Sequence, residues 1–261
     1  MHVWAGHICI ALDGPVPCAP LVVCPPRDPV IPNLLTVRVD VELAQGRGGG
    51  GHEYRHSGQI GGQRWTASAP VWWEAEGRGL EEVHCRIWTD GPGGPRLAVR
   101  SLLRFLVAEV AVRTGGLAVH AAAVSRPEGA VVLLAPSGGG KTTLACTFGR
   151  DAVLADDFCL ISPVGDRFRV PVSPLPGREG LVPTGRPAWL WRVAQVVKAD
   201  EVAFVPLPRA EAVRAVLRSA ILFSSDKEAL DALLGTAIRL LTQSVVGRLW
   251  ATLEHEPWGV M

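Results

Sequence analysis

The chain has 261 residues, of which 48% are apolar and 20% are charged, and its formal net charge is +1 at pH 7. This composition supplies a sizeable hydrophobic core and excludes the disordered and fibrous classes. The near-neutral charge provides no basic field for nucleic acid or an anionic membrane, so we expect neither as a partner.

The first part of the chain predicts a β-rich region, which we place at residues 1–95. Short apolar or alternating runs are separated by proline and glycine, the pattern of strands joined by turns. These runs are HICIAL, PLVVC, NLLTVRVDVEL, RWTASAPVWWEAE and EEVHCRIW.

One motif in this region resembles a zinc site. HEYRH, from His52 to His56, matches the H-E-x-x-H pattern, in which two histidines one helical turn apart bind the metal. The glycines on both sides oppose a helix, because each costs about 1 kcal/mol relative to alanine. We therefore expect a polar loop here and keep a zinc hydrolase as an alternative.

The pattern changes to that of a helix at Arg96. RLAVRSLLRFLVAEVAVRTGG has a wide apolar stripe with helical spacing and ends at two glycines. Its most apolar part is interrupted by Arg104 and Glu109, and it is shorter than the ~20 apolar residues of a membrane span. We therefore expect no membrane anchor.

Two strand-like runs follow, LAVHAAAV and AVVLLA, joined by SRPEG. With residues 125–129 as the connection, the two runs pair antiparallel and Val124 lies opposite Ala130. His120 is then opposite Leu134, beside the glycine-rich loop that comes next. A histidine by itself is more often structural, but this position beside the loop favours a functional role for His120.

The remainder alternates between helices and strands. After the loop we expect a short helix KTTLACTFG, a strand AVLADD, a hairpin turning at Gly165-Asp166, a proline-rich loop at 171–187, strands VAQVV and VAFVPL, and helices RAEAVRAVLRSA and DKEALDALLGTAIRLL. Ser225 and Glu228 predict a capping box at the start of the last helix. The final SVVGRLWATLEHEP stays open between helix and strand.

The cysteines and the N-terminus indicate the compartment. The six cysteines form no C-x-x-C pair and have no regular spacing, so we expect reduced, mostly buried thiols. The first residues lack the basic and long apolar segments of a secretory signal. We expect a soluble cytoplasmic protein.

The stretch APSGGGKTTL, Ala135 to Leu144, matches the phosphate-binding loop G-x-x-x-x-G-K-[ST] except that alanine replaces the first glycine. A buried strand precedes it and a helix follows, as this motif requires. The glycines let backbone N–H groups turn inward around an anion. The residues expected to hold a nucleotide are Pro136, Ser137, Gly138, Gly139, Gly140, Lys141, Thr142 and Thr143.

Lys141 and Thr142 have separate expected roles. Lysine occurs three times among 26 basic residues, so its presence here indicates a need for a compact point charge at the outer phosphates. The Thr142 hydroxyl can complete the coordination shell of Mg²⁺.

Two adjacent carboxylates follow the strand after this helix. We expect this strand to return parallel to the phosphate-loop strand and beside it, so that Asp156 and Asp157 face the phosphates. One carboxylate can hold Mg²⁺ and the other can accept a proton from an attacking hydroxyl. Capping of the following turn is the alternative for both.

Taken together, LAVHAAAV, APSGGGKTTLA and VLADDFCLI resemble the C-terminal catalytic domain of HPr kinase/phosphorylase and its shorter relatives, which include lasso-peptide kinases of peptide natural-product pathways. The resemblance covers Leu97 to Val172. It implies an α/β fold with a P-loop kinase core of the HPr kinase type and a mixed sheet, over residues 96–261. In a phosphotransferase of this kind, we expect the β-rich region 1–95 and the proline-rich loop around Pro174 to Pro187 to recognise the acceptor.

The resemblance also implies the reaction, a transfer of the γ-phosphate of ATP, with Mg²⁺, to a serine-type hydroxyl. By motif position, Asp156 is the general base, Asp157 and Thr142 are on the metal side, and His120 and Lys141 complete the catalytic set. The downstream glycine-rich and arginine signature of the bifunctional enzymes has no counterpart, so the shorter relatives match better.

We therefore expect a cytoplasmic kinase that acts on a serine of a peptide or small protein. Three points stay open at this stage. The acceptor is alternatively a small-molecule alcohol, the chain is alternatively a nucleotide-binding regulatory module without catalysis, and assembly into a homo-oligomer is not decided.

Overall fold

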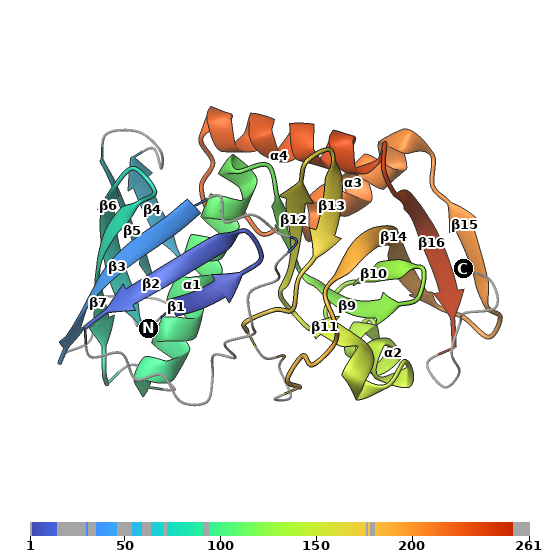
Figure 1. Cartoon of the computed structure of the whole chain (residues 1–261), viewed down its shortest axis with the longest axis horizontal. Coiled ribbons are helices and arrows are strands. Elements are labelled where there is room, and N and C mark those ends of the chain that lie inside the picture. Colours follow the sequence, from blue (N-terminus) through green and yellow to red (C-terminus); the bar gives the residue numbers. More distant parts are fainter. Residues whose placement is uncertain are drawn as a thin grey trace.

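The computed structural model describes residues 2–14, 30, 35–45, 54–58, 64–69, 72–90, 94–175, 177 and 181–252. Within them the chain is mixed α/β and contains two sheets (Figure 1). The N-terminal sheet curls as a half-barrel around a long helix, α1, and the second sheet lies on the other side of that helix. In the described part of the chain, no helix is both long enough and apolar enough to cross a membrane.

The N-terminal sheet has seven strands in the order β1-β2-β3-β7-β6-β5-β4. Its strands are β1 His2–Ala5, β2 Ile8–Asp13, β3 Leu35–Ala44, β4 Arg55–Gly58, β5 Trp65–Ala69, β6 Trp73–Arg78 and β7 Glu82–Trp88. Buried and exposed residues alternate along β5, β6 and β7, because successive side chains point to opposite faces of a sheet. The predicted β-rich N-terminal region is therefore confirmed.

Helix α1, Gly94–Arg113, fills the inner face of this sheet. The Phe105 ring lies 5.7 Å from Trp65 and 5.3 Å from Trp73 between ring centroids, and all three side chains are buried. The same hydrophobic cluster includes Phe158 and Leu160 from the second sheet's side of the helix. Because α1 packs on both sides, its apolar stripe is wide, which is the pattern that predicted it.

The second sheet has nine strands, with β11-β9-β10-β14-β13-β12-β8 as its main path and β16 pairing with both β14 and β15. Its elements, with the helices between them, are β8 Leu117–Val119, β9 Ala121–Arg126, β10 Gly129–Leu134, α2 Lys141–Thr147, the 3₁₀ helix Arg150–Ala152, β11 Val153–Ala155, β12 Cys159–Val164, β13 Arg167–Val170, β14 Ala188–Lys198, β15 Ala203–Pro206, α3 Arg209–Ser219, α4 Lys227–Leu240 and β16 Val245–Ala251. Strand β10 runs parallel to β14 and antiparallel to β9, so the sheet is mixed, as predicted.

The hairpin before the phosphate loop pairs in a different register from the predicted one. Val124 lies opposite Val131, not opposite Ala130, so every pair is shifted by one residue. The reason is that β9 extends to Arg126, which leaves a shorter connection than residues 125–129. His120 lies just beyond this ladder, in the break between β8 and β9.

The strand that precedes the two aspartates is not beside the phosphate-loop strand. β11 pairs antiparallel with β9, and β9 in turn pairs antiparallel with β10. β11 therefore runs in the same direction as β10, as predicted, but the adjacent position is taken by β9. The short hairpin connection explains this, because strands consecutive in sequence pair first.

Two other expectations need correction, and one open assignment is resolved. The N-cap of α4 is Asp226, whose side chain accepts a hydrogen bond from Ala229 N, so the capping box built on Ser225 is wrong. The open C-terminal segment forms a strand, β16. Part of HEYRH, expected as a polar loop, is a strand, because β4 begins at Arg55. His52 and Glu53 lie outside the described residues, as do PLVVC and the glycine-rich residues 46–51 before the motif.

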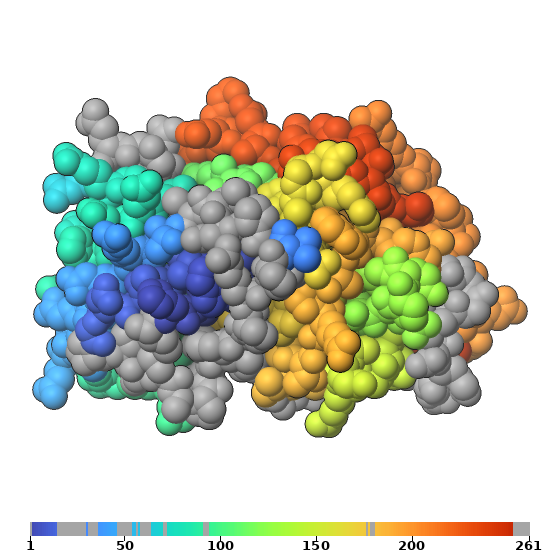
Figure 2. Space-filling model, in the orientation of Figure 1, coloured from blue at the N-terminus to red at the C-terminus, as the bar shows by residue number. Residues whose placement is uncertain are grey.

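The space-filling view shows where the phosphate loop's neighbours lie (Figure 2). The β9–β10 hairpin and α2, in green, are on the opposite half of the molecule from the blue strands of the N-terminal sheet. The connection between the two halves is made by α1 and by the segment around Phe158, both of which belong to the same core.

Candidate functional site

The loop between β10 and α2 needs its three glycines for two reasons, backbone conformation and space. Gly138 and Gly140 have φ of 75° and 88°, in the left-handed region that L-residues with a side chain rarely adopt. Gly139 has no such φ, but a Cβ on it would lie 2.7 Å from the Ala135 Cβ. The φ of Ala135 is not positive, so alanine is accommodated at the first loop position.

Lys141 is nearly buried at the start of α2 and lies across the mouth of the loop. Its ammonium donates to the carbonyl oxygens of Ala135, at 2.7 Å, and Pro136, at 3.1 Å. It also lies 3.2 Å from His120 Nε2. Since an ammonium only donates, this ring nitrogen has to be the acceptor, and the proton of the neutral ring is on Nδ1.

Thr142 and Asp156 form the next contact of the site. The Thr142 hydroxyl donates to Asp156 Oδ1 at 2.7 Å. Asp156 is 1% exposed, and its Oδ2 has no hydrogen-bond partner among the described residues. Gly177, from the proline-rich segment, covers this atom so closely that a Cβ on it would lie 2.0 Å from Oδ2.

An unpaired buried carboxylate oxygen is costly, so its presence indicates a site for a bound group. A hydroxyl and a carboxylate are the hard oxygen ligands that Mg²⁺ prefers, together with phosphate oxygens and water. The pair of Thr142 and Asp156 therefore fits Mg²⁺. Within the described residues, no three or more His, Cys, Asp or Glu side chains gather as a metal site, so other ligands would come from phosphate and water.

Asp157 faces different partners because its backbone turns. Its φ is 67°, the only positive φ of a non-glycine residue in the described part of the chain. One carboxylate oxygen receives a hydrogen bond from Arg104 Nη1 at 2.7 Å, and the other lies 3.1 Å from His120 Nδ1. The Thr142 hydroxyl, which the sequence pairs with Asp157 on the metal side, contacts Asp156 in this structure.

His120 is held at both nitrogens. Partial burial and, next, the Lys141 ammonium lower the pKa of the imidazole below its usual value, while the Asp157 carboxylate opposes this shift. The ring is therefore neutral near pH 7. Nδ1–H donates to Asp157 and Nε2 accepts from Lys141, which links the carboxylate to the phosphate loop.

These side chains surround a cavity of about 280 Å³. Every predicted site residue except Pro136 lines it. The lining comprises His120, Ser137, Gly138, Gly139, Gly140, Lys141, Thr142, Thr143, Asp156, Asp157 and Lys198.

The sequence analysis missed two residues of this site, Lys198 and Arg104. Lys198 ends β14, which neighbours β10 in parallel, so it reaches the same edge of the sheet as the loop. The scarcity of lysine is a signal for it, since two of the three lysines line the cavity. No sequence signal identifies Arg104, which only interrupts an apolar run.

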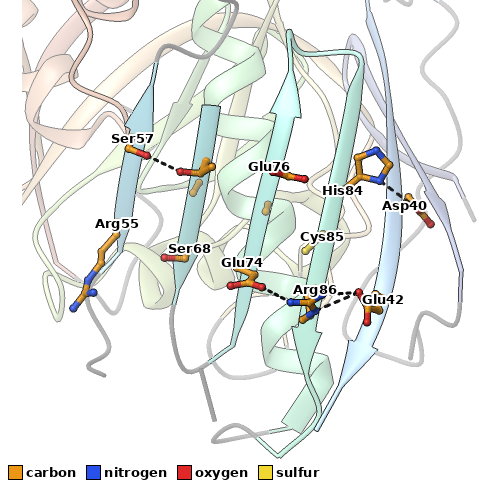
Figure 3. A pocket seen from close by; sticks show the side chains of 13 residues that line it. Asp40, Glu42, Arg55, Ser57, Ser68, Glu74, Glu76, His84, Cys85 and Arg86 are labelled. Atoms are coloured by element: carbon orange, nitrogen blue, oxygen red, sulfur yellow. Dashed lines mark hydrogen bonds and ion pairs between the residues drawn. The ribbon is translucent and has the colours of Figure 1, made fainter. Parts of the chain in front are cut away.

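A larger hollow of about 620 Å³ lies on the outer face of the N-terminal sheet (Figure 3). Its charged side chains pair mainly with one another. Arg86 bridges Glu42 and Glu74, at 3.1 and 2.8 Å, and His84 Nδ1 lies 3.4 Å from Asp40. None of the predicted catalytic residues lines this hollow.

No protein-family model matches the chain, and a search of curated proteins finds no similar one. The function is therefore argued from the geometry of the cavity around Lys141.

Proposed function

We propose that the protein is a kinase that uses ATP and Mg²⁺ to phosphorylate a hydroxyl, with a serine of a peptide or small protein as the acceptor. The observation that carries the proposal is the unpaired Asp156 Oδ2 beside the Thr142 hydroxyl, at the edge of a glycine loop closed by Lys141. A loop that only caps a helix needs neither the lysine nor the buried carboxylate.

Each part of the cavity has a role in this proposal. The loop N–H groups and Lys141 bind the phosphates, and Lys198 adds a second positive charge from β14. Thr142 and Asp156 hold Mg²⁺, which neutralises charge on the outer phosphates when it is bound. This assignment moves the metal partner of Thr142 from Asp157 to Asp156, in keeping with their contact.

The remaining chemistry is the transfer itself. The acceptor oxygen forms a bond to the γ-phosphorus as the bond to the bridging oxygen of ADP breaks, and the hydroxyl proton passes to a base. We assign Asp156 Oδ2 as this base, because it is the carboxylate oxygen without a donor, and we assign Oδ1, which contacts the Thr142 hydroxyl, to the Mg²⁺ side. Both oxygens of Asp157 are engaged by Arg104 and His120.

The acceptor has to reach an atom that the protein covers. Gly177 lies against Asp156 Oδ2, so the acceptor hydroxyl enters only when Gly177 moves from Asp156. We propose that the proline-rich loop around Pro174 to Pro187 and residues 1–95 recognise the acceptor. The reaction then takes place in the cytoplasm, where the thiols Cys9, Cys85, Cys146 and Cys159 stay reduced, as they are here.

The same covering of Asp156 favours a second candidate, a regulatory module that binds nucleotide without transferring phosphate. Asp156→Asn separates the two. The amide oxygen can still accept from Thr142, but it cannot take a proton, so we expect transfer to fall by about 10²- to 10⁴-fold. Exposed Asp166→Asn, in the turn after β12, is the matched control.

The acceptor assay incubates the protein with ATP, Mg²⁺ and the peptides and small proteins encoded beside its gene, with mass spectrometry as the readout. A mass gain of one phosphate on a serine, absent with Asp156→Asn, supports the kinase. ATP binding without a gain on any peptide, protein or small alcohol supports the regulatory module. Full transfer by Asp156→Asn contradicts the base assignment.

A further inference from the structure

Arg104 connects the long helix to the phosphate site. It lies on α1 and extends to the turn after β11, where its side chain is 24% exposed and that of Asp157 is 12% exposed. The guanidinium also lies over the Phe158 ring, 5.4 Å from the centroid. The cation is therefore fixed between the helix and the turn that carries the two aspartates.

Its main partner is the one non-glycine residue with a left-handed backbone in the described chain. Residues with a side chain rarely adopt this conformation, and aspartate adopts it where its side chain has local hydrogen-bond partners. Arg104 Nη1 donates to Asp157 Oδ2 at 2.7 Å, and Nη2 lies 3.5 Å from the Asp157 carbonyl oxygen. A planar guanidinium that contacts both the carboxylate and the carbonyl oxygen of Asp157 stabilises this turn.

The turn decides which way the second carboxylate oxygen points. Asp157 Oδ1 lies 3.1 Å from His120 Nδ1, and the Asp157 carbonyl oxygen lies 3.2 Å from the same nitrogen. Both oxygens are acceptors, so they require the proton on Nδ1 and leave the Nε2 lone pair toward Lys141, at 3.2 Å. A chain of contacts thus runs from Arg104 through Asp157 and His120 to Lys141.

We propose that Arg104 is a positioning residue of the phosphate site. By holding Asp157 in its left-handed turn, it fixes His120 in the tautomer that accepts from Lys141, and so sets the position of the Lys141 ammonium in the loop. Its effect on catalysis rests on the proposed kinase function. Its effect on the His120 ring does not.

The test measures the ring directly. In the full-length protein labelled with ¹⁵N-histidine, the His120 signals are assigned by their loss in His120→Gln. We expect neutral His120 to carry its proton on Nδ1. In Arg104→Ala, Asp157 is released and the ring shifts toward the Nε2–H form, which cannot accept from Lys141. Arg96→Ala, an exposed arginine on the same helix, leaves the tautomer unchanged.

Activity and the conservative variant complete the test. We expect Arg104→Ala to lower kcat by about 10- to 100-fold through misplacement of the site, and Arg104→Lys, which keeps the charge without the planar fork, to recover part of the loss. Circular dichroism and melting temperature establish that each variant is folded. If Arg104→Ala does not fold, Arg104→Lys and Arg104→Gln are compared by the same ring spectrum.

The outcomes separate the two proposals. If folded Arg104→Ala, or folded Arg104→Gln, keeps the wild-type His120 tautomer, the positioning role is wrong, whatever the activity. If the tautomer changes but the wild-type protein transfers no phosphate to any acceptor, the positioning role stands and the kinase proposal fails.

Discussion

Asp156 and Asp157 are adjacent in the chain but have different surroundings. Asp156 follows the last residue of β11, and its side chain contacts Thr142 on one side and lies against Gly177 on the other. Asp157 adopts a positive φ and faces Arg104 and His120 instead. A single change of backbone region thus lets neighbouring carboxylates contact Thr142 and His120 on two sides of one cavity.

Lys198 provides a residue-scale prediction. It lines the cavity from β14, and its side chain is exposed, so its contact with phosphate should be modest. We expect Lys198→Ala to raise the dissociation constant for ATP with Mg²⁺ by about 5- to 10-fold, measured by isothermal titration calorimetry. Lys227→Ala removes an exposed lysine that pairs with Asp231 on α4, and it should leave the affinity unchanged. If the two variants bind ATP with equal affinity, Lys198 does not contribute to nucleotide binding.

His7 provides a second prediction, on stability. Its ring is fully buried, with Nε2 lying 2.7 Å from the Thr114 hydroxyl. Burial lowers the pKa of His7 from 6.5 to about 4. Between these values the unfolded chain binds a proton that the folded protein does not, so the free energy of unfolding falls as the pH drops from 6.5 to 4.

The loss through His7 should reach about 3 kcal/mol and level off below pH 4. The measurement is urea unfolding at several pH values for the wild type and for His7→Gln, whose amide can still donate to Thr114. The difference between the two proteins isolates this histidine from other groups. A difference that stays constant from pH 7 to pH 4 would contradict the prediction.

At the scale of elements, the polar residues of α1 have definite tasks. Glu109 interrupts the apolar run, but it is buried and accepts hydrogen bonds from the backbone N–H groups of Phe223 and Ser224. Arg113, one turn later, pairs with both Glu109 and Asp226. These contacts attach the loop before α4 to the end of α1. A polar residue in an apolar helix can therefore mark an anchoring point.

The start of α4 gives a prediction that compares two neighbouring residues. Asp226 Oδ1 accepts from Ala229 N at 2.9 Å, and Oδ2 pairs with nearly buried Arg113. We expect Asp226→Ala to lower the free energy of unfolding by about 2–4 kcal/mol, since it removes a cap and a buried partner. Ser225→Ala, at an exposed position, should cost less than about 0.5 kcal/mol.

The third variant, Asp226→Asn, separates the two contributions. Asparagine caps a helix as well as aspartate does, but it lacks the charge that faces Arg113. Its unfolding free energy should lie between those of the wild type and Asp226→Ala. A loss for Ser225→Ala as large as that for Asp226→Ala would restore the capping box predicted from the sequence.

Signals local in the sequence predicted most helices and strands correctly. The predictions that failed concern which strands pair and in which register. Apolar periodicity identified α1, and the motif at Ala135 to Leu144 identified the loop, because these depend on residues close in sequence. The register of β9 against β10 depends on where a turn closes, which one residue changes. The place of β11 depends on competition between strands, and β16 requires a partner far along the chain, so neither is encoded locally.

For the candidate site, too, the local motif was predictable from the sequence and the tertiary contacts were not. The residues from Ser137 to Thr143 form one local motif, and the carboxylates follow it closely in sequence. Thr142 contacts Asp156 because Asp157 adopts a left-handed backbone conformation, and the identity of residue 157 does not predict that conformation. Arg104 enters through tertiary packing of α1 alone, which a single sequence does not reveal.

At the scale of the whole molecule, α1 packs against both the N-terminal sheet and the part of the chain that carries the glycine loop. Its aromatic Phe105 packs against the N-terminal sheet, whereas Arg104 pairs with Asp157 at the cavity and Glu109 holds the loop before α4. The boundary predicted at residue 95 separates the two sheets in sequence but leaves the helix between them. Stability and the geometry of the site are therefore coupled through one element.

This coupling predicts how the chain unfolds. The fragment 94–261 retains α1 complete but removes its contacts with Trp65 and Trp73, which exposes the apolar face of the helix; each lost large side chain costs about 1.5–3 kcal/mol. We expect the full chain to unfold in one cooperative transition by circular dichroism, and the fragment to bind a hydrophobic dye and lack that transition. Adding residues 1–93 in trans should restore it in part. A fragment that unfolds cooperatively at the temperature of the full chain would instead show that α1 and the second sheet form an independent unit, with the N-terminal sheet attached to it.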